Sequence, residues 1–159
     1  MIGRTLVAGV GNVLRGDDGF GVEVVRRLAG QPLPGDTSVV DFGIRGVHLA
    51  YQLLDGYDTL ILIDALARGE PPGTLYLMEP DMDELPPREL VDGHDLDPAA
   101  VLGMVKLLGG SIRRTVVVGC EPADLDERMG LSPPVALAVE EAVRLVRRLV
   151  DERTKETTS

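Results

Sequence analysis

Short apolar runs alternate along the chain with longer segments of helical periodicity, and this alternation strongly restricts the possible folds. Each run is β-branched or otherwise apolar and is bounded by Gly, Asp or Pro, as strands usually are. The five runs span residues 5–8, 38–41, 59–63, 74–78 and 115–118. Strands that alternate with helices favour a mostly parallel sheet covered on both faces. The sequence therefore predicts an α/β fold of three layers, an α/β/α sandwich built on five strands.

Four segments carry apolar residues at the i, i+3, i+4 or i+7 spacing of a helix with one buried stripe. They span residues 22–29, 47–54, 101–108 and 132–150. The third has Asp97 in the N-cap position, Pro98 at the first helical position and Gly109 just past its end. The fourth begins at Ser132, with Pro133 behind it, and keeps its apolar face to about residue 150. Each helix therefore has one face to bury against the sheet.

The connections add expectations about the layout. The link 65–73 between the third and fourth strands is short, which indicates a hairpin and therefore one antiparallel strand, placed at an edge. Residues 79–95 are rich in Pro and acidic residues, have no clear period and form a loop. A chain of 159 residues is long enough for one layered domain. We expect residues 1–150 to form this domain and residues 151–159 to be a frayed tail.

Composition excludes several classes of protein. The formal net charge is -10, and such a surface repels phosphate backbones, so we expect no nucleic-acid partner. The chain has no run of about 18 apolar residues, and its start lacks the pattern of a signal peptide, so we expect a cytoplasmic protein without a membrane partner. Cys120 is the single cysteine and cannot form a disulfide within the chain.

Candidate ligands lie in loops at the edge where such folds bind, beyond the carboxyl ends of the strands. Asp17 and Asp18 lie in the glycine-rich loop after the first strand, Asp64 ends the third strand, and His94 precedes the third helix. Taken singly, the aspartates fit turns or helix caps and the histidine fits a solvated loop. Together, carboxylate oxygens and one imidazole form an O,O,N set that suits a borderline divalent metal and leaves coordination positions open.

Five segments of the chain form a recognisable set. They read GVGNVLRGDDGFG, DFGIRG followed by HLAYQLLDGYDTLILIDA, HDLDPAAVLGMVKLLGG, VVVGCEP and GLSPPV. With these segments the chain resembles the hydrogenase maturation endopeptidases over about its whole folded length, and the first and third are specific in combination. The resemblance implies an α/β/α sandwich that cleaves the large-subunit precursor of a nickel-iron hydrogenase once, near its C-terminus, after nickel insertion.

The resemblance also implies which residues act. The family's nickel-recognising trio matches Asp18, Asp64 and His94, which would be both catalytic and metal-binding. The precursor would supply the nickel, and the enzyme would hold no tightly bound metal of its own. The seated nickel would polarise the scissile carbonyl or the attacking water. We expect a supporting set of residues to shape the loops around the trio: Gly9, Gly11, Asn12, Asp17, Asp41 and Gly43.

Two positions depart from the family pattern. Many relatives carry Glu where this chain has Asp18, so this carboxylate reaches about one methylene less far and the loop has to compensate. Relatives often have Thr in the segment that reads DFGIRG here, and Ile44 offers no such hydroxyl. The first departure affects the reach of a predicted ligand, and the second removes the hydroxyl on which a polar role of that segment would depend.

Other functions fit parts of the same sequence. Gly9 and Gly11 follow a strand, as in a dinucleotide-binding module, but Leu14 occupies the place of the third glycine. The acidic pair that follows would repel a bound pyrophosphate. A non-enzymatic nickel chaperone or docking protein could use the same trio, because no hydrolase motif such as G-x-S-x-G is present. A cysteine peptidase would need Cys120 beside His94, without a nucleophile motif around the cysteine.

Overall fold

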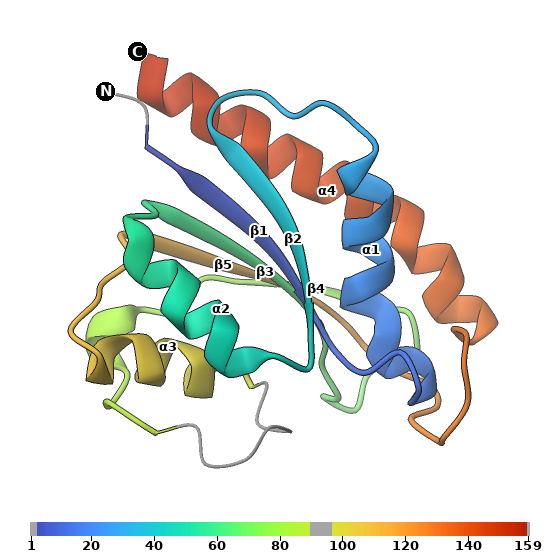
Figure 1. Cartoon of the computed structure of the whole chain (residues 1–159). Coiled ribbons are helices and arrows are strands. Elements are labelled where there is room, and N and C mark those ends of the chain that lie inside the picture. Colours follow the sequence, from blue (N-terminus) through green and yellow to red (C-terminus); the bar gives the residue numbers. More distant parts are fainter. Residues whose placement is uncertain (1–2, 90–96, 159) are drawn as a thin grey trace.

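The computed structural model describes residues 3–89 and 97–158, and these form a central sheet between two pairs of helices (Figure 1). The strands are β1 (Thr5–Val10), β2 (Thr37–Gly43), β3 (Thr59–Ala65), β4 (Leu75–Met78) and β5 (Arg114–Cys120). The α-helices are α1 (Phe20–Ala29), α2 (Gly46–Gln52), α3 (Pro98–Leu107) and α4 (Pro133–Thr158). Short 3-10 helices are η1 (Gly16–Gly19), η2 (Leu53–Asp55) and η3 (Met82–Glu84). The predicted α/β/α sandwich is confirmed.

The sheet has the strand order β2-β1-β3-β5-β4. β4 is antiparallel to β5 and the other neighbours are parallel, so the predicted antiparallel edge strand is confirmed. The predicted hairpin between β3 and β4 is wrong, because Tyr76 of β4 pairs with Gly119 of β5. The physical reason is that β1 and β5 already occupy both edges of β3, which leaves no edge for a further strand.

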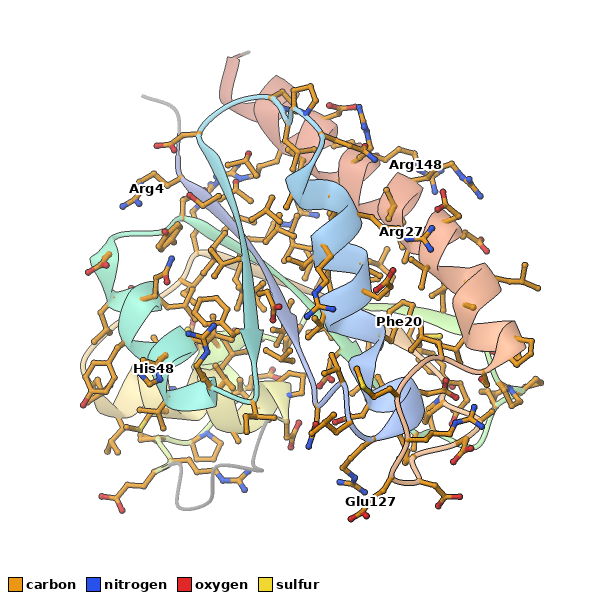
Figure 2. The ribbon with its side chains drawn as sticks, turned by 45° about the vertical axis from the view of Figure 1, so that its right-hand side comes forward. Arg4, Phe20, Arg27, His48, Glu127 and Arg148 are labelled. Carbon is orange, nitrogen blue, oxygen red and sulfur yellow. The ribbon has the colours of Figure 1, made fainter. Side chains whose placement is uncertain are left out.

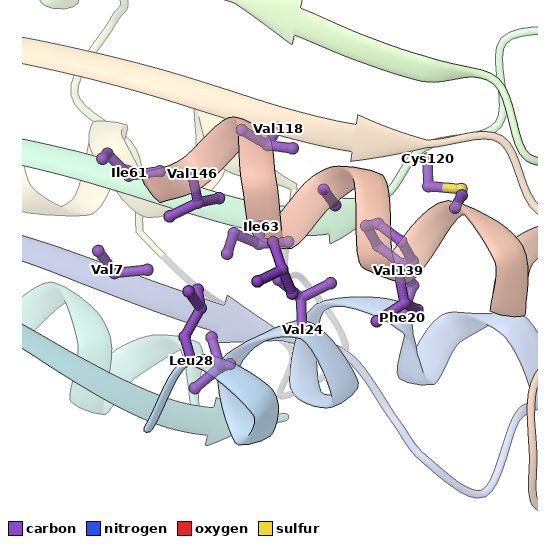
Figure 3. Packing of buried hydrophobic residues seen from close by; sticks show 14 of the residues in the cluster. Val7, Phe20, Val24, Leu28, Ile61, Ile63, Val118, Cys120, Val139 and Val146 are labelled. Atoms are coloured by element: carbon purple, nitrogen blue, oxygen red, sulfur yellow. The ribbon is translucent and has the colours of Figure 1, made fainter. Parts of the chain in front are cut away.

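Two hydrophobic cores lie on opposite faces of the sheet, because successive side chains of a strand point to opposite faces. One core lies under α1 and α4 and contains Phe20, Ile63 and Val118 (Figure 3). The other lies under α2 and α3 and contains Leu62 and Val117. Successive side chains of β3 and β5 alternate between these two cores. This alternation determines the face of the sheet to which each polar residue at the carboxyl end of the strand points.

Two glycines let α1 approach the sheet closely at this carboxyl edge. A Cβ on Gly9 of β1 would lie 2.3 Å from the carbonyl oxygen of Gly21 in α1. A Cβ on Gly21 would lie 2.2 Å from the carbonyl oxygen of Ile63 in β3. Neither position therefore has room for a side chain. The two glycines hold the start of α1 against the end of β3, next to Asp64.

Helix α3 has the boundaries that the sequence predicts. The side chain of Asp97 accepts a hydrogen bond from the backbone N–H of Ala99 at 3.3 Å, which caps the helix. Pro98 is the first helical residue, where its missing N–H costs nothing. Gly109 follows the helix with a φ of 82°, a conformation that favours glycine. The predicted start and stop signals of this helix are confirmed.

The last helix is longer than the sequence predicts. α4 continues to Thr158, beyond residue 150, up to which the apolar face predicts it. Arg153 provides a physical reason: its side chain is buried, its Nε donates to Thr59 Oγ1 at 2.7 Å, and its guanidinium pairs with Asp58. Apolar periodicity could not reveal this contact because the anchoring residue is charged. None of the described helices is long and apolar enough to cross a bilayer.

Candidate active site

Three parts of the chain meet at the carboxyl edge of the sheet. They are residues 11–19 after β1, Asp64 at the end of β3, and residues 121–132 between β5 and α4. The backbone N–H groups of the turn at residues 16–19, here called the GDDG turn, donate two hydrogen bonds of 2.8 Å to the carbonyls of Arg128 and Asp124. The segment between β5 and α4 therefore fixes the position of this turn.

Asp17 of the GDDG turn is fully buried and is a structural anchor. Its carboxylate accepts hydrogen bonds of 2.7–3.0 Å from the backbone N–H groups of Ala123, Asp124 and Ser132 and from the Ser132 hydroxyl. Burial alone would raise the pKa of Asp17, but these donors outweigh it and hold the pKa below its ordinary value. The ionised carboxylate ties the turn to the start of α4, and its lone pairs are used within the fold.

Asp18 is half-buried, and its carboxylate is less occupied than that of Asp17. Its Oδ2 accepts one hydrogen bond of 2.8 Å from the backbone N–H of Asn12. Gly11 makes this geometry possible, because it has a φ of 139° and a Cβ there would lie 1.9 Å from the carbonyl oxygen of Asp18. Within residues 3–89 and 97–158 no other donor bonds the Asp18 carboxylate, which retains capacity for a ligand.

Asp64 is the second carboxylate of the predicted trio. By strand alternation its side chain points to the α2–α3 face, as Leu62 does, and it is only 6% exposed. Its Oδ1 accepts one hydrogen bond of 2.8 Å from the backbone N–H of Ala65. Burial, followed by the negative charges of Asp18 and Asp97, raises the pKa of Asp64 well above its ordinary value. An ionised Asp64 is therefore costly unless a cation compensates it.

The structure brings two members of the predicted trio together. The charge of Asp18 acts on Asp64, while His94 lies outside the described residues. The other histidine, His48, is exposed on α2 (Figure 2). In the part of the chain that the structure describes, no three His, Cys, Asp or Glu residues are grouped so that they could hold a metal ion. Two carboxylates alone form a weak and open site that needs further ligands.

The turn after β2 borders this edge. The backbone N–H of Gly43 donates to Asp41 Oδ1 at 2.9 Å, and Gly43 has a φ of 55°. The Gly43 carbonyl accepts a hydrogen bond of 2.8 Å from the N–H of Gly11, which pins the turn to the loop after β1. Asp41 also lies 3.8 Å from Arg26 in an ion pair, and Ile44 is exposed beyond the turn. Asp41 and Gly43 thus shape the loops around Asp18.

Glu121 is a further acidic residue at this edge, for which the sequence analysis gives no role. It is buried and accepts hydrogen bonds from the N–H groups of Arg68 at 2.7 Å and Glu70 at 3.1 Å, and from the Tyr76 hydroxyl at 2.5 Å. The bond from Tyr76 is the main cause that lowers the pKa of Glu121. Glu121 therefore fastens the link between β3 and β4 to the end of β5. The sequence signal that could have indicated a role for Glu121 is its position, as a charged residue directly after a buried strand.

Cys120 is a buried thiol on the opposite face of the sheet from Asp64. It is fully buried in the core under α1 and α4 (Figure 3). Burial, followed by the charges of Asp17 and Glu121, raises the pKa of the thiol to about 12. The reactive thiolate is therefore scarce at neutral pH. These features contradict the cysteine-peptidase alternative.

The loop after β1 also lacks what a dinucleotide requires. The N–H groups of Gly11 and Asn12 already donate to the Gly43 carbonyl and to the Asp18 carboxylate. The 3-10 helix η1, which precedes α1, carries two acidic residues where a phosphate would need positive potential. The backbone donors of this loop are occupied, and the start of α1 carries negative charge. Both features argue against the dinucleotide-binding alternative.

Known proteins that match this chain include hydrogenase maturation proteases and hydrogenase expression/formation proteins. A family model described as hydrogenase maturation protease matches residues 22–149, a span that includes Asp64 and begins after the GDDG turn. The hydrogenase expression/formation protein HupD of Rhodobacter capsulatus is 36% identical over 162 residues, which cover 98% of this chain and 77% of HupD. The sequence similarity thus extends over the loop that carries Asp18.

Solved structures agree with the sequence comparison. The hydrogenase maturating endopeptidase HybD from E. coli superposes with a TM-score of 0.79 at 29% identity, over 94% of this chain and 93% of HybD. The hydrogenase 2 maturation peptidase from a Thaumarchaeota archaeon superposes with a TM-score of 0.72 at 33% identity, over 93% of this chain and 98% of that chain. The similarity therefore covers nearly the whole fold of both proteins.

Proposed function

Because this chain belongs to the hydrogenase maturation protease family, a family of hydrolases, we propose that it removes the C-terminal extension from the large-subunit precursor of a nickel-iron hydrogenase. In this proposal Asp18, Asp64 and His94 recognise nickel that is already bound in the precursor. The nickel is therefore part of the substrate, and the enzyme needs no tightly bound metal of its own.

The observation that carries the proposal is the pair of carboxylates at the carboxyl edge of the sheet. Asp64 is buried, has one hydrogen-bond donor and lies near the charge of Asp18. A divalent cation would relieve both the burial of Asp64 and the repulsion between the two carboxylates. An open set of oxygen ligands also suits a metal that another protein already coordinates. Family membership supports nickel as that metal.

In the proposed reaction, Asp18 and Asp64 bind the nickel on the side that the precursor leaves open, and His94 adds an imidazole. This contact holds the scissile bond beside the metal, which polarises its carbonyl or an attacking water. The water oxygen adds to the carbonyl carbon and the C–N bond breaks. The protons of the water pass to the leaving amine and to the new carboxyl group. The protein residues therefore act by positioning and charge, without a covalent intermediate.

Dependence on nickel in the substrate tests this proposal. Precursor purified from nickel-depleted cells and precursor from nickel-replete cells are each mixed with the enzyme, and the mobility shift of the large subunit is followed. We expect only the nickel-replete precursor to be trimmed. A chelator too weak to remove the seated nickel should leave trimming unchanged. Equal trimming of the two precursors would show that the metal is not recognised.

The two histidines provide a matched pair for the third member of the trio. We expect His94→Ala to stop trimming of nickel-replete precursor, because it removes the only imidazole proposed as a ligand. His48→Ala, at an exposed position on α2, should trim at the normal rate. Normal trimming by both variants would overturn the assignment of His94.

A further inference from the structure

A pocket of about 300 Å³ lies between the start of α3 and the edge of the sheet formed by β4 and β5. Six apolar residues line it; one is Pro80, just after β4, and the others are Leu66, Met78, Pro98, Ala99 and Val117. These residues come from the link after β3, from β4, from the first turn of α3 and from β5. The pocket therefore lies on the α2–α3 face of the sheet, the face to which Asp64 points.

Strand geometry places this pocket next to Asp64. Leu66 follows Asp64 by two residues, and the paired residue of Asp64 on β5 is Gly119. A Cβ on Gly119 would lie 2.6 Å from Leu66 Cδ1, so glycine is what allows Leu66 to lie across the end of β5. Asp97 borders the pocket, and its charge also acts on Asp64. The pocket and the carboxylate pair therefore share one border.

The charged groups at the pocket rim already have partners. Asp97 caps α3, and Glu79 forms an ion pair of 2.6 Å with Arg114. The guanidinium of Arg68 lies 6.0 Å from the centroid of the Tyr76 ring, within the range of a cation–π contact. Because these groups interact within the fold, the surface that remains for a ligand is mainly apolar. An aliphatic group fits this surface better than a charged one.

We propose that this pocket binds an aliphatic side chain of the precursor's tail, from a residue next to the scissile bond. The inference rests on the proposed function, because it takes the tail as the ligand. At about 300 Å³ the pocket lies at the lower end of the range of ligand pockets, about 300–1,000 Å³, and has room for an aliphatic side chain. A residue beside the scissile bond has to lie close to a metal held by Asp18 and Asp64, and Leu66 and Asp97 link the pocket to Asp64.

Filling the pocket tests the inference. Ala99→Leu adds an aliphatic side chain in the first turn of α3 and keeps the backbone N–H that Asp97 accepts. We expect kcat/KM for nickel-replete precursor to fall at least about tenfold, the scale at which extra methylenes in a pocket discriminate. Ala29→Leu is the matched control, because Ala29 is an exposed helical alanine at the opposite end of the sheet. The control should process at the normal rate.

A panel of precursors then locates the side chain. The first and the second residue of the tail after the scissile bond are each replaced singly by Ala, and each precursor is offered to the wild type and to Ala99→Leu. At one position the shorter side chain should restore most of the rate that Ala99→Leu loses. Met78→Ala, which enlarges the pocket, should accept Phe at that same position better than the wild type does. Circular dichroism and thermal melting establish that each variant is folded.

The outcomes separate the pocket from the proposed function. If the wild type trims none of the precursors, the proposed function fails. If the wild type trims normally and Ala99→Leu does too, only the pocket assignment fails. The pocket assignment also fails if Ala99→Leu is slow with every precursor in the panel and Met78→Ala shows no change in preference. Compensation at a single position supports it.

Discussion

Asp17 and Asp64 lie at the same edge of the sheet and are both nearly inaccessible, yet their environments have opposite effects on the carboxyl group. Asp17 accepts hydrogen bonds from three backbone N–H groups and one hydroxyl, whereas Asp64 accepts one and faces two other acidic residues. The pKa of Asp17 is therefore lowered and that of Asp64 is raised. Burial raises the pKa of both groups: four donors outweigh it at Asp17, whereas at Asp64 it dominates, because a single donor and the charges of Asp18 and Asp97 do not offset it.

The same contrast divides two neighbours in the sequence. Asp17 points into the segment between β5 and α4, and Asp18 accepts a single backbone hydrogen bond near Asp64. In this way the GDDG turn uses one aspartate to hold its position and leaves the next one free to bind. A ligand residue gains precision when a rigid neighbour supports it. The substitutions below test whether Asp17 contributes to stability while Asp18 and Asp64 contribute to activity.

The largest expected effect is that of Asp64→Asn on activity. Trimming of nickel-replete precursor should fall by more than about 100-fold, because the amide cannot supply the charge that the metal requires. Asp126→Asn, at an exposed position of the segment between β5 and α4, should trim normally. The free energy of unfolding of Asp64→Asn should stay within about 1 kcal/mol of the wild type or rise, as at sites that favour function over stability. If chemical denaturation shows that Asp64→Asn loses activity because it unfolds, the contrast between Asp64 and Asp17 fails.

The converse effect is expected for Asp17→Asn. The amide replaces an acceptor oxygen with an NH₂ group that faces donors from Ser132 or Ala123, so at least one charge-assisted hydrogen bond is lost. We expect the free energy of unfolding to fall by about 2–4 kcal/mol. Glu127→Gln, an exposed carboxylate on the same segment (Figure 2), should change it by less than about 0.5 kcal/mol. A stability equal to that of the wild type would show that Asp17 is not an anchor.

The pH dependence of stability sharpens the same comparison. The pKa of Asp17 is lower in the folded chain than the ordinary value of 3.8, so its stabilisation is fully present above about pH 4. It is lost as the pH falls through the lowered folded pKa, when the folded state also takes up the proton. The difference in unfolding free energy between wild type and Asp17→Asn should therefore be constant from pH 8 to 5 and shrink as the pH approaches 3. Urea titrations at these pH values measure it. A constant difference at every pH would contradict the ionised anchor.

Apolar periodicity and turn signals were sufficient to predict the positions of the strands and of most helices. The cap at Asp97 and the stop at Gly109 are local signals, and local hydrogen bonds and backbone angles determine both. The pairing of β4 with β5 is a non-local choice that depends on which edge is vacant, and link length does not report it. The end of α4 depends on Arg153, whose contact with Thr59 is equally non-local.

The candidate site shows the same limit. Strand ends predicted the position of Asp64, but strand and turn patterns alone could not distinguish the roles of Asp17 and Asp18, which share one turn and which only the family resemblance separated. Their roles depend on donors more than a hundred residues away, among them Ser132. Glu121 was missed for a similar reason, because its partners come from the link before β4. Positions were predictable from strand order, whereas the number of hydrogen bonds at each carboxylate required the folded chain.

The smallest effect is expected for Ser132→Ala, which removes only one of the donors to Asp17. The hydroxyl lies 2.8 Å from Asp17 Oδ2, while the backbone N–H of the same residue donates to Oδ1 at 2.7 Å and is kept. A hydrogen bond to a charged group contributes about 1.5–3 kcal/mol, so the loss should be smaller than that of Asp17→Asn and near the lower value. In the double variant the two losses should not add, because both remove the same interaction. Ser111→Ala, at an exposed serine, serves as the control for the hydroxyl itself. Additive losses in thermal and chemical unfolding would mean that Ser132 stabilises the start of α4 independently of Asp17.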